Sequence, residues 1–270
     1  MNLIKAVKRF WTDKSIFPTV VTFTGGMGAQ MISAAIYFSM KNSGQAVYAD
    51  LTYFDKPENV AVAGNPGDCS HWSWQLDKFG LTPLSFETSP NLTKKNSKIL
   101  HDGPEKLGLG LNALVQPEIQ NYFRIPPGVE DILPREFAKG FLCMHVRRGD
   151  YVNVASHLVA DSEFINLARK LTGLTDNLVV ISDSPISPEF RNSVSSNFKH
   201  VSFQDNTDAF IAHRIMRNAR ILICSNSQFS LIAALLNPQA LVLIPKQWFG
   251  ENDRHIEASI HSRSSFQIME

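Results

Sequence analysis

Short apolar runs, each leading into a helical pattern, recur along this sequence and constrain its fold more than any other feature. The β-branched run TVVTF at 19–23 passes through a glycine turn into a helical pattern with Gly44 near its end. In the second half, apolar runs at 140–146 and 178–182 flank a helical pattern at 161–172. Strands that alternate with helices in this way form parallel sheets with crossover helices. The sequence therefore predicts an α/β fold.

The remaining elements continue the alternation. Pro126 and Pro127 interrupt regular structure, because proline lacks an N–H donor and restricts its neighbours. We place a domain boundary there and divide the chain into domains at 1–130 and 131–270. We also expect strands at 46–50, 199–203 and 219–225, and a last strand at 240–245. Helices are expected at 207–218 and 229–237, and a loop at 55–72. Asp161 or Ser162 is expected to cap the helix at 161–172.

Charge and cysteine content argue against several classes of protein. The 26 basic and 25 acidic residues nearly cancel and no basic run stands out, so nucleic-acid binding is not expected. Cys69, Cys143 and Cys224 form an odd set without a CxxC pattern, which argues against a disulfide framework and a zinc site. Cys143 and Cys224 lie in apolar runs and are predicted to be buried thiols in strands. A reducing cytoplasm is the expected location.

The N-terminal residues 1–17 have two interpretations. No stretch of the sequence approaches the roughly 18 apolar residues of a membrane span. The segment is not a signal peptide, because Lys5, Lys8 and Arg9 interrupt its apolar residues. Those apolar residues recur at helical spacing, which fits either an interfacial helix in peripheral contact with a membrane or a helix packed on the protein.

The motif HVRRGDY at 145–151 directly follows an apolar strand. Ligands of open α/β sheets bind beyond the carboxyl ends of strands. A strand interior would not accommodate two adjacent arginines, so Arg147 and Arg148 are expected to begin a loop. Their planar, always-charged guanidinium groups suit phosphate oxygens. The alternative is a salt-bridged turn in which Arg148 pairs with Asp150.

A second apolar strand also ends in polar residues, and a helix begins immediately after it. Ser225, Asn226 and Ser227 are all good N-caps. A helix N-terminus presents backbone N–H groups and a partial positive charge, which suits a phosphate. Ordinary capping explains the same residues equally well.

Two further motifs follow expected strands. The glycine-rich GGMGAQ at 25–30 is neither GxGxxG nor a Walker motif, which argues against dinucleotide dehydrogenases and P-loop enzymes. Asp183, in VVISDSP at 179–185, has a carboxylate that can accept hydrogen bonds from N1–H and the exocyclic amine of guanine. A cap or turn before Pro185 is the alternative. The chain has no D-x-D triplet of the kind that holds a metal on a sugar diphosphate, so no metal is expected.

Taken in order, these motifs resemble the family-eleven glycosyltransferases, the α-1,2-fucosyltransferases of bacteria and animals. The arginine motif is also shared with α-1,6-fucosyltransferases and protein O-fucosyltransferases. The resemblance spans roughly 25 to 249 and rests on GGMGAQM (25–31), HVRRGDY (145–151), SDS (182–184), SNSQFSLIAALLNP (225–238) and VLIPKQWF (242–249).

The resemblance implies a GT-B-type fold, in which two Rossmann-like domains face a cleft. It implies inverting, metal-independent transfer of fucose from GDP-fucose, the donor substrate, to an oligosaccharide or glycolipid. Domain 1–130 would take the acceptor and 131–270 the donor. Arg147 would contact the β-phosphate, and His145 and Asp183 would hold guanine. The other implied donor-binding residues are Gly25, Gly26, Gly28, Gln30, Arg148, Ser225, Asn226, Ser227, Gln228 and Phe229.

Departures from the family pattern bear mainly on the acceptor. Ala29 replaces the usual Asn, Ile32 the usual Phe, and Leu231-Ile232 the usual aromatic pair. The linkage is therefore less constrained than the donor, and the general base stays open, with Asp150 as the candidate nearest to Arg147. A catalytically silent GDP-sugar-binding protein, a transferase with a different GDP-sugar or linkage, and a phosphate-recognising enzyme such as a sulfotransferase remain alternatives.

Overall fold

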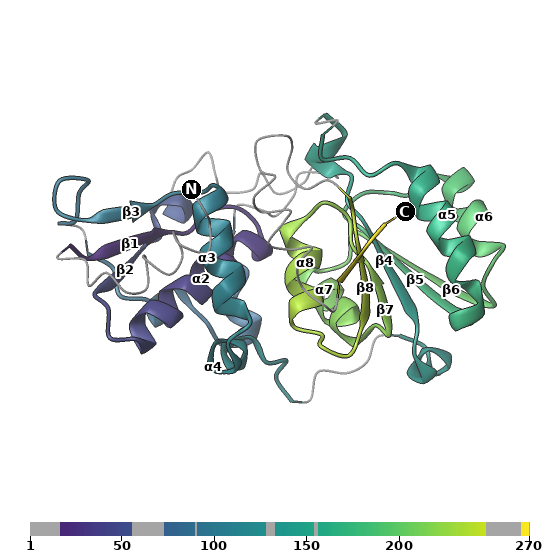
Figure 1. The fold of residues 1–270 in the computed structure, drawn as a ribbon, viewed down its shortest axis with the longest axis horizontal. Coiled ribbons are helices and arrows are strands. Elements are labelled where there is room, and N and C mark those ends of the chain that lie inside the picture. Colours follow the sequence, from purple (N-terminus) through teal and green to yellow (C-terminus); the bar gives the residue numbers. More distant parts are fainter. Residues whose placement is uncertain are drawn as a thin grey trace. The chain divides into compact units, whose positions relative to one another are not determined.

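The computed structural model describes residues 17–55, 73–89, 91–127, 133–153, 156–246 and 266–269, without the side chains of Asp150 and Asn153. The chain forms two compact units, Met1–Pro126 and Pro127–Glu270. The division falls between the two prolines at which the sequence analysis placed a boundary. Both units contain a parallel sheet with helices, which confirms the predicted α/β fold (Figure 1).

The first unit contains a three-stranded parallel sheet in the order β2-β1-β3. The strands are β1 (Thr19–Thr22), β2 (Val47–Asp50) and β3 (Lys98–Leu100). Its α-helices are α2 (Met27–Asn42), α3 (Pro104–Leu114) and α4 (Pro117–Gln120), and its 3₁₀-helices are η1 (Thr52–Asp55), η4 (Asp77–Phe79), η5 (Pro83–Ser85) and η6 (Asn121–Phe123). Most of α2 is buried, so this helix forms the centre of the unit.

Helices α2 and α3 approach each other closely at one point. A Cβ atom on Gly110 of α3 would lie 2.5 Å from Cγ2 of Ile32 on α2. Glycine is therefore needed at this contact, although it disfavours helix by about 1 kcal/mol relative to alanine. The sequence analysis predicted no helix at α3, because Gly108 and Gly110 have low helix propensity.

The second unit contains a six-stranded parallel sheet in the order β6-β5-β4-β7-β8-β9. From β4 the chain adds β5 and β6 on one side, then returns to place β7, β8 and β9 on the other. This is the doubly wound arrangement, with its topological switch point between β4 and β7. The strands are β4 (Leu142–Val146), β5 (Asn177–Ser182), β6 (His200–Asp205), β7 (Ile221–Ile223), β8 (Leu241–Ile244) and β9 (Phe266–Ile268).

Helices cover both faces of this sheet. Figure 1 shows α5 and α6 on one side and α7 and α8 on the other. Leu142, Met144 and Val146 of β4 belong to the hydrophobic core with residues of α5 and α6. Because side chains alternate along a strand, Cys143 and His145 point to the opposite face. The helices are α5 (Asp161–Leu171), α6 (Pro188–Ser195), α7 (Ala209–Asn218) and α8 (Gln228–Leu235), and the 3₁₀-helices are η7 (Arg135–Lys139), η8 (Gly149–Asn153) and η9 (Thr172–Leu174).

Local sequence explains where these helices begin. Ser187 accepts a hydrogen bond from the N–H of Phe190, and Pro188 occupies the first turn of α6, where no N–H is needed. Asp208 accepts hydrogen bonds from the N–H groups of Phe210 and Ile211 at the start of α7. Such caps satisfy donors that have no partner inside the helix.

Two details of the structure differ from the sequence predictions, and a third prediction falls on residues that the structure does not describe. The strand at 240–245 is not the last one, because the short edge strand β9 pairs with β8. This strand has three residues, of which only Phe266 is buried, so it is too short for the sequence pattern to reveal it. Asp161 is the first residue of α5 and makes no cap, since Ala160 holds the N-cap position. Residues 1–16, which carry the predicted N-terminal helix, lie outside the described residues.

No helix in the described part of the chain is both long and apolar enough to cross a membrane.

Candidate functional site

Three of the predicted motifs meet at the topological switch point of the second unit. Strand β4 pairs in parallel with β5 on one side and β7 on the other, so their carboxyl ends lie at one edge of the sheet. The segments that follow them carry Arg147, Asp183 and Ser227, respectively. This edge is where open α/β sheets bind ligands. The unit therefore assembles a single candidate site from segments far apart in the sequence.

Arg147 and Asp183 form an ion pair at the centre of this edge. Nη1 of Arg147 lies 2.7 Å from Oδ2 of Asp183, and their side chains are 13% and 17% exposed. The guanidinium also lies over the ring of Tyr151, with Cζ 5.0 Å from the ring centroid. Arg147 is thus held in place by both a carboxylate and an aromatic face.

The other oxygen of the Asp183 carboxylate binds the backbone of residues 147–149, the segment after β4 that we call the arginine loop. Oδ1 accepts a hydrogen bond of 2.8 Å from the backbone N–H of Arg148. The next N–H, that of Gly149, donates to Oγ of Ser184 at 3.1 Å. The sequence analysis expected the Asp183 carboxylate to receive guanine donors. In the structure both of its oxygens are engaged by the arginine loop.

Arg148 braces the loop against the start of α5. Its guanidinium forms an ion pair with Asp161 and donates to the carbonyl oxygens of Arg147 at 2.9 Å and Val159 at 3.2 Å. Its Cζ lies 5.8 Å from the ring centroid of Phe164. The sequence analysis considered Asp150 as the acid paired with Arg148, whereas the ion pair in the structure is with Asp161. The side chain of Asp150, the candidate base, lies outside the described residues.

His145 connects the β4 and β7 segments beneath this edge. It is buried, and its Nδ1 lies 3.0 Å from Oγ of Ser225. Burial, followed by the charges of Arg147 and Arg148, lowers the pKa of His145 to about 3. The imidazole is therefore neutral at physiological pH. The ring of Phe229 lies 5.6 Å from it, centroid to centroid.

The β7 segment ends in the N-terminus of α8. Ser227 is the N-cap, and its hydroxyl accepts a hydrogen bond of 3.3 Å from the N–H of Phe229. The capping interpretation thus holds for Ser227, and the same geometry directs the N-terminus of an eight-residue helix toward the edge. Asn226 is buried, and its amide donates to the carbonyl of Ser156 at 3.3 Å. Gln228, the first residue of α8, is only partly buried.

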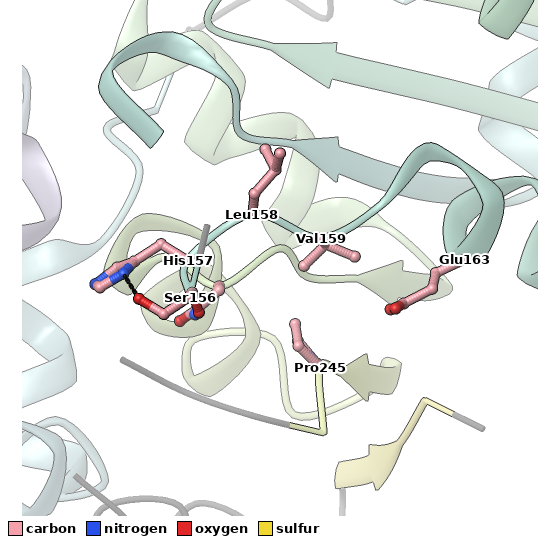
Figure 2. Close-up of a pocket in the computed structure, with 7 residues that line it drawn as sticks. Ser156, His157, Leu158, Val159, Glu163 and Pro245 are labelled. Atoms are coloured by element: carbon pink, nitrogen blue, oxygen red, sulfur yellow. Dashed lines mark hydrogen bonds between the residues drawn. The ribbon is translucent and has the colours of Figure 1, made fainter. Parts of the chain in front are cut away.

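A pocket of about 140 Å³ opens beside Asn226, beyond the carboxyl ends of β7 and β8 (Figure 2). It is lined by Ser156, His157, Leu158, Val159, Glu163, Asn226 and Pro245. Figure 2 shows Ser156 and His157 turned toward each other, and Nδ1 of His157 lies 3.0 Å from the Ser156 hydroxyl. The ring of His157 also contacts Tyr151, with ring centroids 5.2 Å apart. The sequence analysis missed the segment 156–159, because it contains no motif.

The predicted residues of the glycine-rich segment lie in the first unit. Gly25 has a φ of 66°, in the left-handed region that favours glycine. Gln30 is fully buried, and its amide donates to the carbonyls of Gly25 and Ser73, both at 2.8 Å, and accepts from the N–H of Gln75 at 2.9 Å. Gln30 therefore ties the loop together. Gly26 precedes α2 as its N-cap, and Gly28 is buried in its first turn.

The first unit has a polar cluster that the sequence analysis did not single out. Lys106 is buried, yet its ammonium bonds the carbonyl of Thr22 and lies 2.7 Å from Oδ1 of Asp102. The hydroxyl of Thr24 donates to the other oxygen of Asp102. Burial lowers the pKa of Lys106, and the Asp102 charge opposes this shift. A single lysine in the first turn of a helix carries no sequence signal of such a cluster.

Among the described residues no group of three or more His, Cys, Asp or Glu side chains is placed to hold a metal ion.

Comparisons with known proteins point to one family. Residues 114–264, more than half of the chain, match glycosyl transferase family 11. A search of curated proteins gives no match.

Several solved structures are similar in fold at low identity. The E. coli heptosyltransferase WaaC with ADP has a TM-score of 0.47 at 10% identity, covering 93% of this chain and 92% of that chain. E. coli ADP-heptose lps heptosyltransferase II has a TM-score of 0.45 at 9% identity, covering 93% and 89%. POFUT1 in complex with GDP-fucose has a TM-score of 0.39 at 13% identity, covering 86% and 76%.

Proposed function

The chain belongs to glycosyl transferase family 11, and from this premise we propose that it transfers L-fucose from GDP-fucose to a hydroxyl group of a glycan. We propose galactose as the acceptor sugar, an α-1,2 linkage, inversion at the anomeric carbon and no metal. One observation carries the proposal. Arg147 and the N-terminus of α8 lie at neighbouring strand ends of the switch point, where both can serve one diphosphate.

The proposed reaction builds up negative charge that Arg147 and the N-terminus of α8 can stabilise. The acceptor oxygen forms a bond to the anomeric carbon, while the bond from that carbon to the β-phosphate oxygen breaks. GDP leaves with the bonding electron pair, and the acceptor proton passes to a base or to water. Negative charge therefore grows on the β-phosphate. A fixed guanidinium and a helix N-terminus stabilise such charge without reorganisation, and this is the role we assign to Arg147 and Ser227.

The neutral His145 fits a role in donor binding. With a pKa of about 3 its imidazole adds no charge at physiological pH, so it can exchange hydrogen bonds without repelling the Arg147 cation. Its bond to Ser225 fixes the orientation of the ring. We assign His145 and the Ser225–Phe229 segment to the donor nucleotide and sugar.

The acceptor side is the less constrained part of the proposal. We assign the acceptor, an oligosaccharide or a glycolipid, to the first unit, and the glycine-rich segment of that unit to the donor. Asp150 is the candidate base, by its sequence position beside the arginine pair. A cytoplasmic enzyme in peripheral contact with a membrane through residues 1–17 would suit a glycolipid acceptor.

A donor and acceptor screen tests the proposal. Purified protein is incubated with GDP-fucose, GDP-mannose, a UDP-sugar or an ADP-sugar against a panel of glycans, and products are followed by mass spectrometry. We expect turnover with GDP-fucose and a terminal galactose, and loss of turnover in Arg147→Ala. Turnover confined to another donor would refute the fucose assignment. Tight GDP binding with neither transfer nor donor hydrolysis would indicate a catalytically silent protein.

A further inference from the structure

We propose that the carboxylate of Asp102 binds hydroxyl groups of the acceptor sugar at the switch point of the first unit. The inference rests on the proposed function, which assigns the acceptor to this unit without naming a residue that binds it. A carboxylate suits this task, because it accepts hydrogen bonds and sugar hydroxyl groups donate them. Hydrogen bonds to a charged acceptor are also the stronger kind.

The topology of the first sheet places Asp102 where a ligand is expected. From β1 the chain adds β2 on one side and then returns to place β3 on the other. All three strands are parallel, so the switch point lies between β1 and β3. Thr24 follows the end of β1, and Asp102 follows the end of β3. Open α/β sheets bind ligands at this place, beyond the carboxyl ends of the strands.

Two side chains hold the Asp102 carboxylate in a fixed orientation. Nζ of Lys106 lies 2.7 Å from Oδ1, and the hydroxyl of Thr24 donates to Oδ2. The same ammonium also donates to the carbonyl oxygen of Thr22, so it is tied to the end of β1. Both oxygens of Asp102 therefore have a partner from the sheet edge or from α3. An acceptor that is oriented in advance binds a ligand at a lower entropic cost.

The carboxylate nevertheless remains accessible. The side chain of Lys106 is only 3% exposed, whereas that of Asp102 is 58% exposed. A carboxylate has about four acceptor positions, and Lys106 and Thr24 use one each. The cluster thus fixes Asp102 on its protein side and presents the remaining acceptor capacity to solvent, as a binding group for hydroxyl donors requires.

Partly exposed aromatic rings follow the neighbouring strand β2. Tyr53 and Phe54 lie in η1, with ring centroids 5.2 Å apart, and the ring of Trp74 lies 5.4 Å from that of Phe54. Burial raises the pKa of Tyr53, a hydrogen bond with the backbone of Gly25 opposes this shift, and the charge of Asp102 adds to it. Aromatic faces beside a few polar groups are typical of small-molecule sites, and the C–H faces of a sugar ring pack on such rings.

The charge of the cluster favours an acceptor over a donor at this place. The Lys106 cation is buried and already paired, so the accessible charge is that of Asp102. A carboxylate repels an anionic diphosphate but binds the hydroxyl groups of a neutral glycan. Thr24 directly precedes Gly25, in the segment that we assign to the donor. A sugar bound to Asp102 would therefore lie beside the donor segment.

Glu105 offers a matched control on the same element. It lies in the first turn of α3, and its Oε1 is 2.9 Å from Nζ of Lys98. Its side chain is 64% exposed, close to the 58% of Asp102. The Glu105–Lys98 pair has no part in the proposed acceptor site. Glu105→Gln therefore reports what the loss of an accessible carboxylate–lysine pair does to the first unit.

The experiment compares initial rates of Asp102→Asn and Glu105→Gln in the full-length protein, with GDP-fucose as donor and lactose, which ends in galactose, as acceptor. We expect Asp102→Asn to raise the KM for lactose by about 10-fold or more, the loss expected for hydrogen bonds to a charged group. The KM for GDP-fucose, and the rate of its hydrolysis without acceptor, should stay within about twofold of wild type. Glu105→Gln should leave all three quantities within about twofold.

Two kinetic outcomes with a folded Asp102→Asn variant would overturn the proposal. An unchanged KM for lactose would do so, even with a lower kcat, because that pattern would mark a group that acts only on the reaction step. A rise in the KM for GDP-fucose without a rise for lactose would place Asp102 on the donor side. Circular dichroism and the thermal midpoint, compared with those of Glu105→Gln, establish whether the variant is folded.

Thr24→Val decides the question if Asp102→Asn does not fold. It keeps the carboxylate and its pair with Lys106, and it removes the hydroxyl that orients Oδ2. The KM for lactose should then rise by about threefold or more, and an unchanged value would overturn the proposal. Failure of the proposed function would appear in wild type instead, as an absence of fucose transfer to lactose, and the inference would fall with it.

Discussion

Gly149 and Asp183 lie so close that no side chain larger than hydrogen fits between the arginine loop and the carboxylate. We predict that Gly149→Ala pushes Asp183 away from Arg147 and strains a backbone with a φ of 29°. Turnover of GDP-fucose should fall by about 10-fold or more, with a stability loss of about 1–2 kcal/mol from the strained conformation.

Gly173→Ala provides the matched comparison for Gly149→Ala. A Cβ atom on Gly173 would meet no other atom within 4 Å, and the φ of this residue lies outside the left-handed region. The same substitution there should leave turnover within about twofold of wild type. Normal turnover in folded Gly149→Ala would show that the Arg147–Asp183 contact is dispensable.

Arg147→Lys tests the geometry of the cation rather than its charge. Lysine can still pair with Asp183, but its ammonium is a point charge and cannot copy the planar fork. We expect kcat to fall by about 10²–10³-fold, the usual loss for one transition-state contact. Arg191 of α6, which forms an ion pair with Asp205 at the end of the neighbouring strand β6, provides the control, and Arg191→Lys should stay active. Activity close to wild type in a folded Arg147→Lys variant would remove Arg147 from this role.

Activity should not depend on a divalent metal. The chain has no D-x-D triplet, and the proposed mechanism assigns the phosphate charge to Arg147 and the α8 N-terminus. Initial rates should therefore stay nearly unchanged in excess EDTA. Collapse of turnover with chelator, followed by recovery with manganese, would contradict the metal-free mechanism. A mild stimulation by metal has another explanation, because metals bind the free GDP product.

Stability should fall on acidification because His145 is buried in its neutral form. Its pKa is about 3 in the folded protein, below the ordinary value of 6.5. Between these values the unfolded chain binds the proton and the folded chain does not, so folding weakens as pH decreases from 6.5 toward 3. The pKa of His213 is lowered in the same direction, chiefly by burial.

His145→Asn measures this contribution. One such group contributes a slope of up to about 1.4 kcal/mol per pH unit in this window. The variant should lose stability less steeply than wild type when urea unfolding is compared between about pH 7 and pH 5. Identical slopes for the two proteins would show that His145 is not buried in neutral form.

The contact between Gly110 and Ile32 should limit substitution in the first unit. Alanine at Gly110 would favour helix by about 1 kcal/mol, but overpacking against Ile32 costs about 1–3 kcal/mol. We therefore expect Gly110→Ala to destabilise the unit. Ile32→Ala removes the atoms nearest to the new Cβ, so the two substitutions together should be less harmful than their sum. Additive effects in thermal unfolding would contradict this close approach.

Much of the second unit follows from local patterns in the sequence. The apolar runs at β4, β5, β7 and β8 are buried in the sheet, apart from Leu241 at the start of β8, which is partly buried. Position after a strand end correctly located the Arg147, Asp183 and Ser227 segments, because parallel strands bring their carboxyl ends to one edge. No single apolar run predicts the order of the strands in the sheet. That order makes β4 and β7 neighbours.

The sequence by itself determined the α/β class, most of the buried strands and the residues that collect at the switch point, because these depend on local periodicity and chain order. Only the tertiary structure decided their partners. It assigned Asp161, thirteen positions away, to Arg148, and it assigned Arg147 to Asp183, thirty-six positions away. It also formed α3 despite two glycines, because contact with Ile32 outweighs helix propensity. Side-chain pairing depends on distances in space, which a pattern along the chain does not contain.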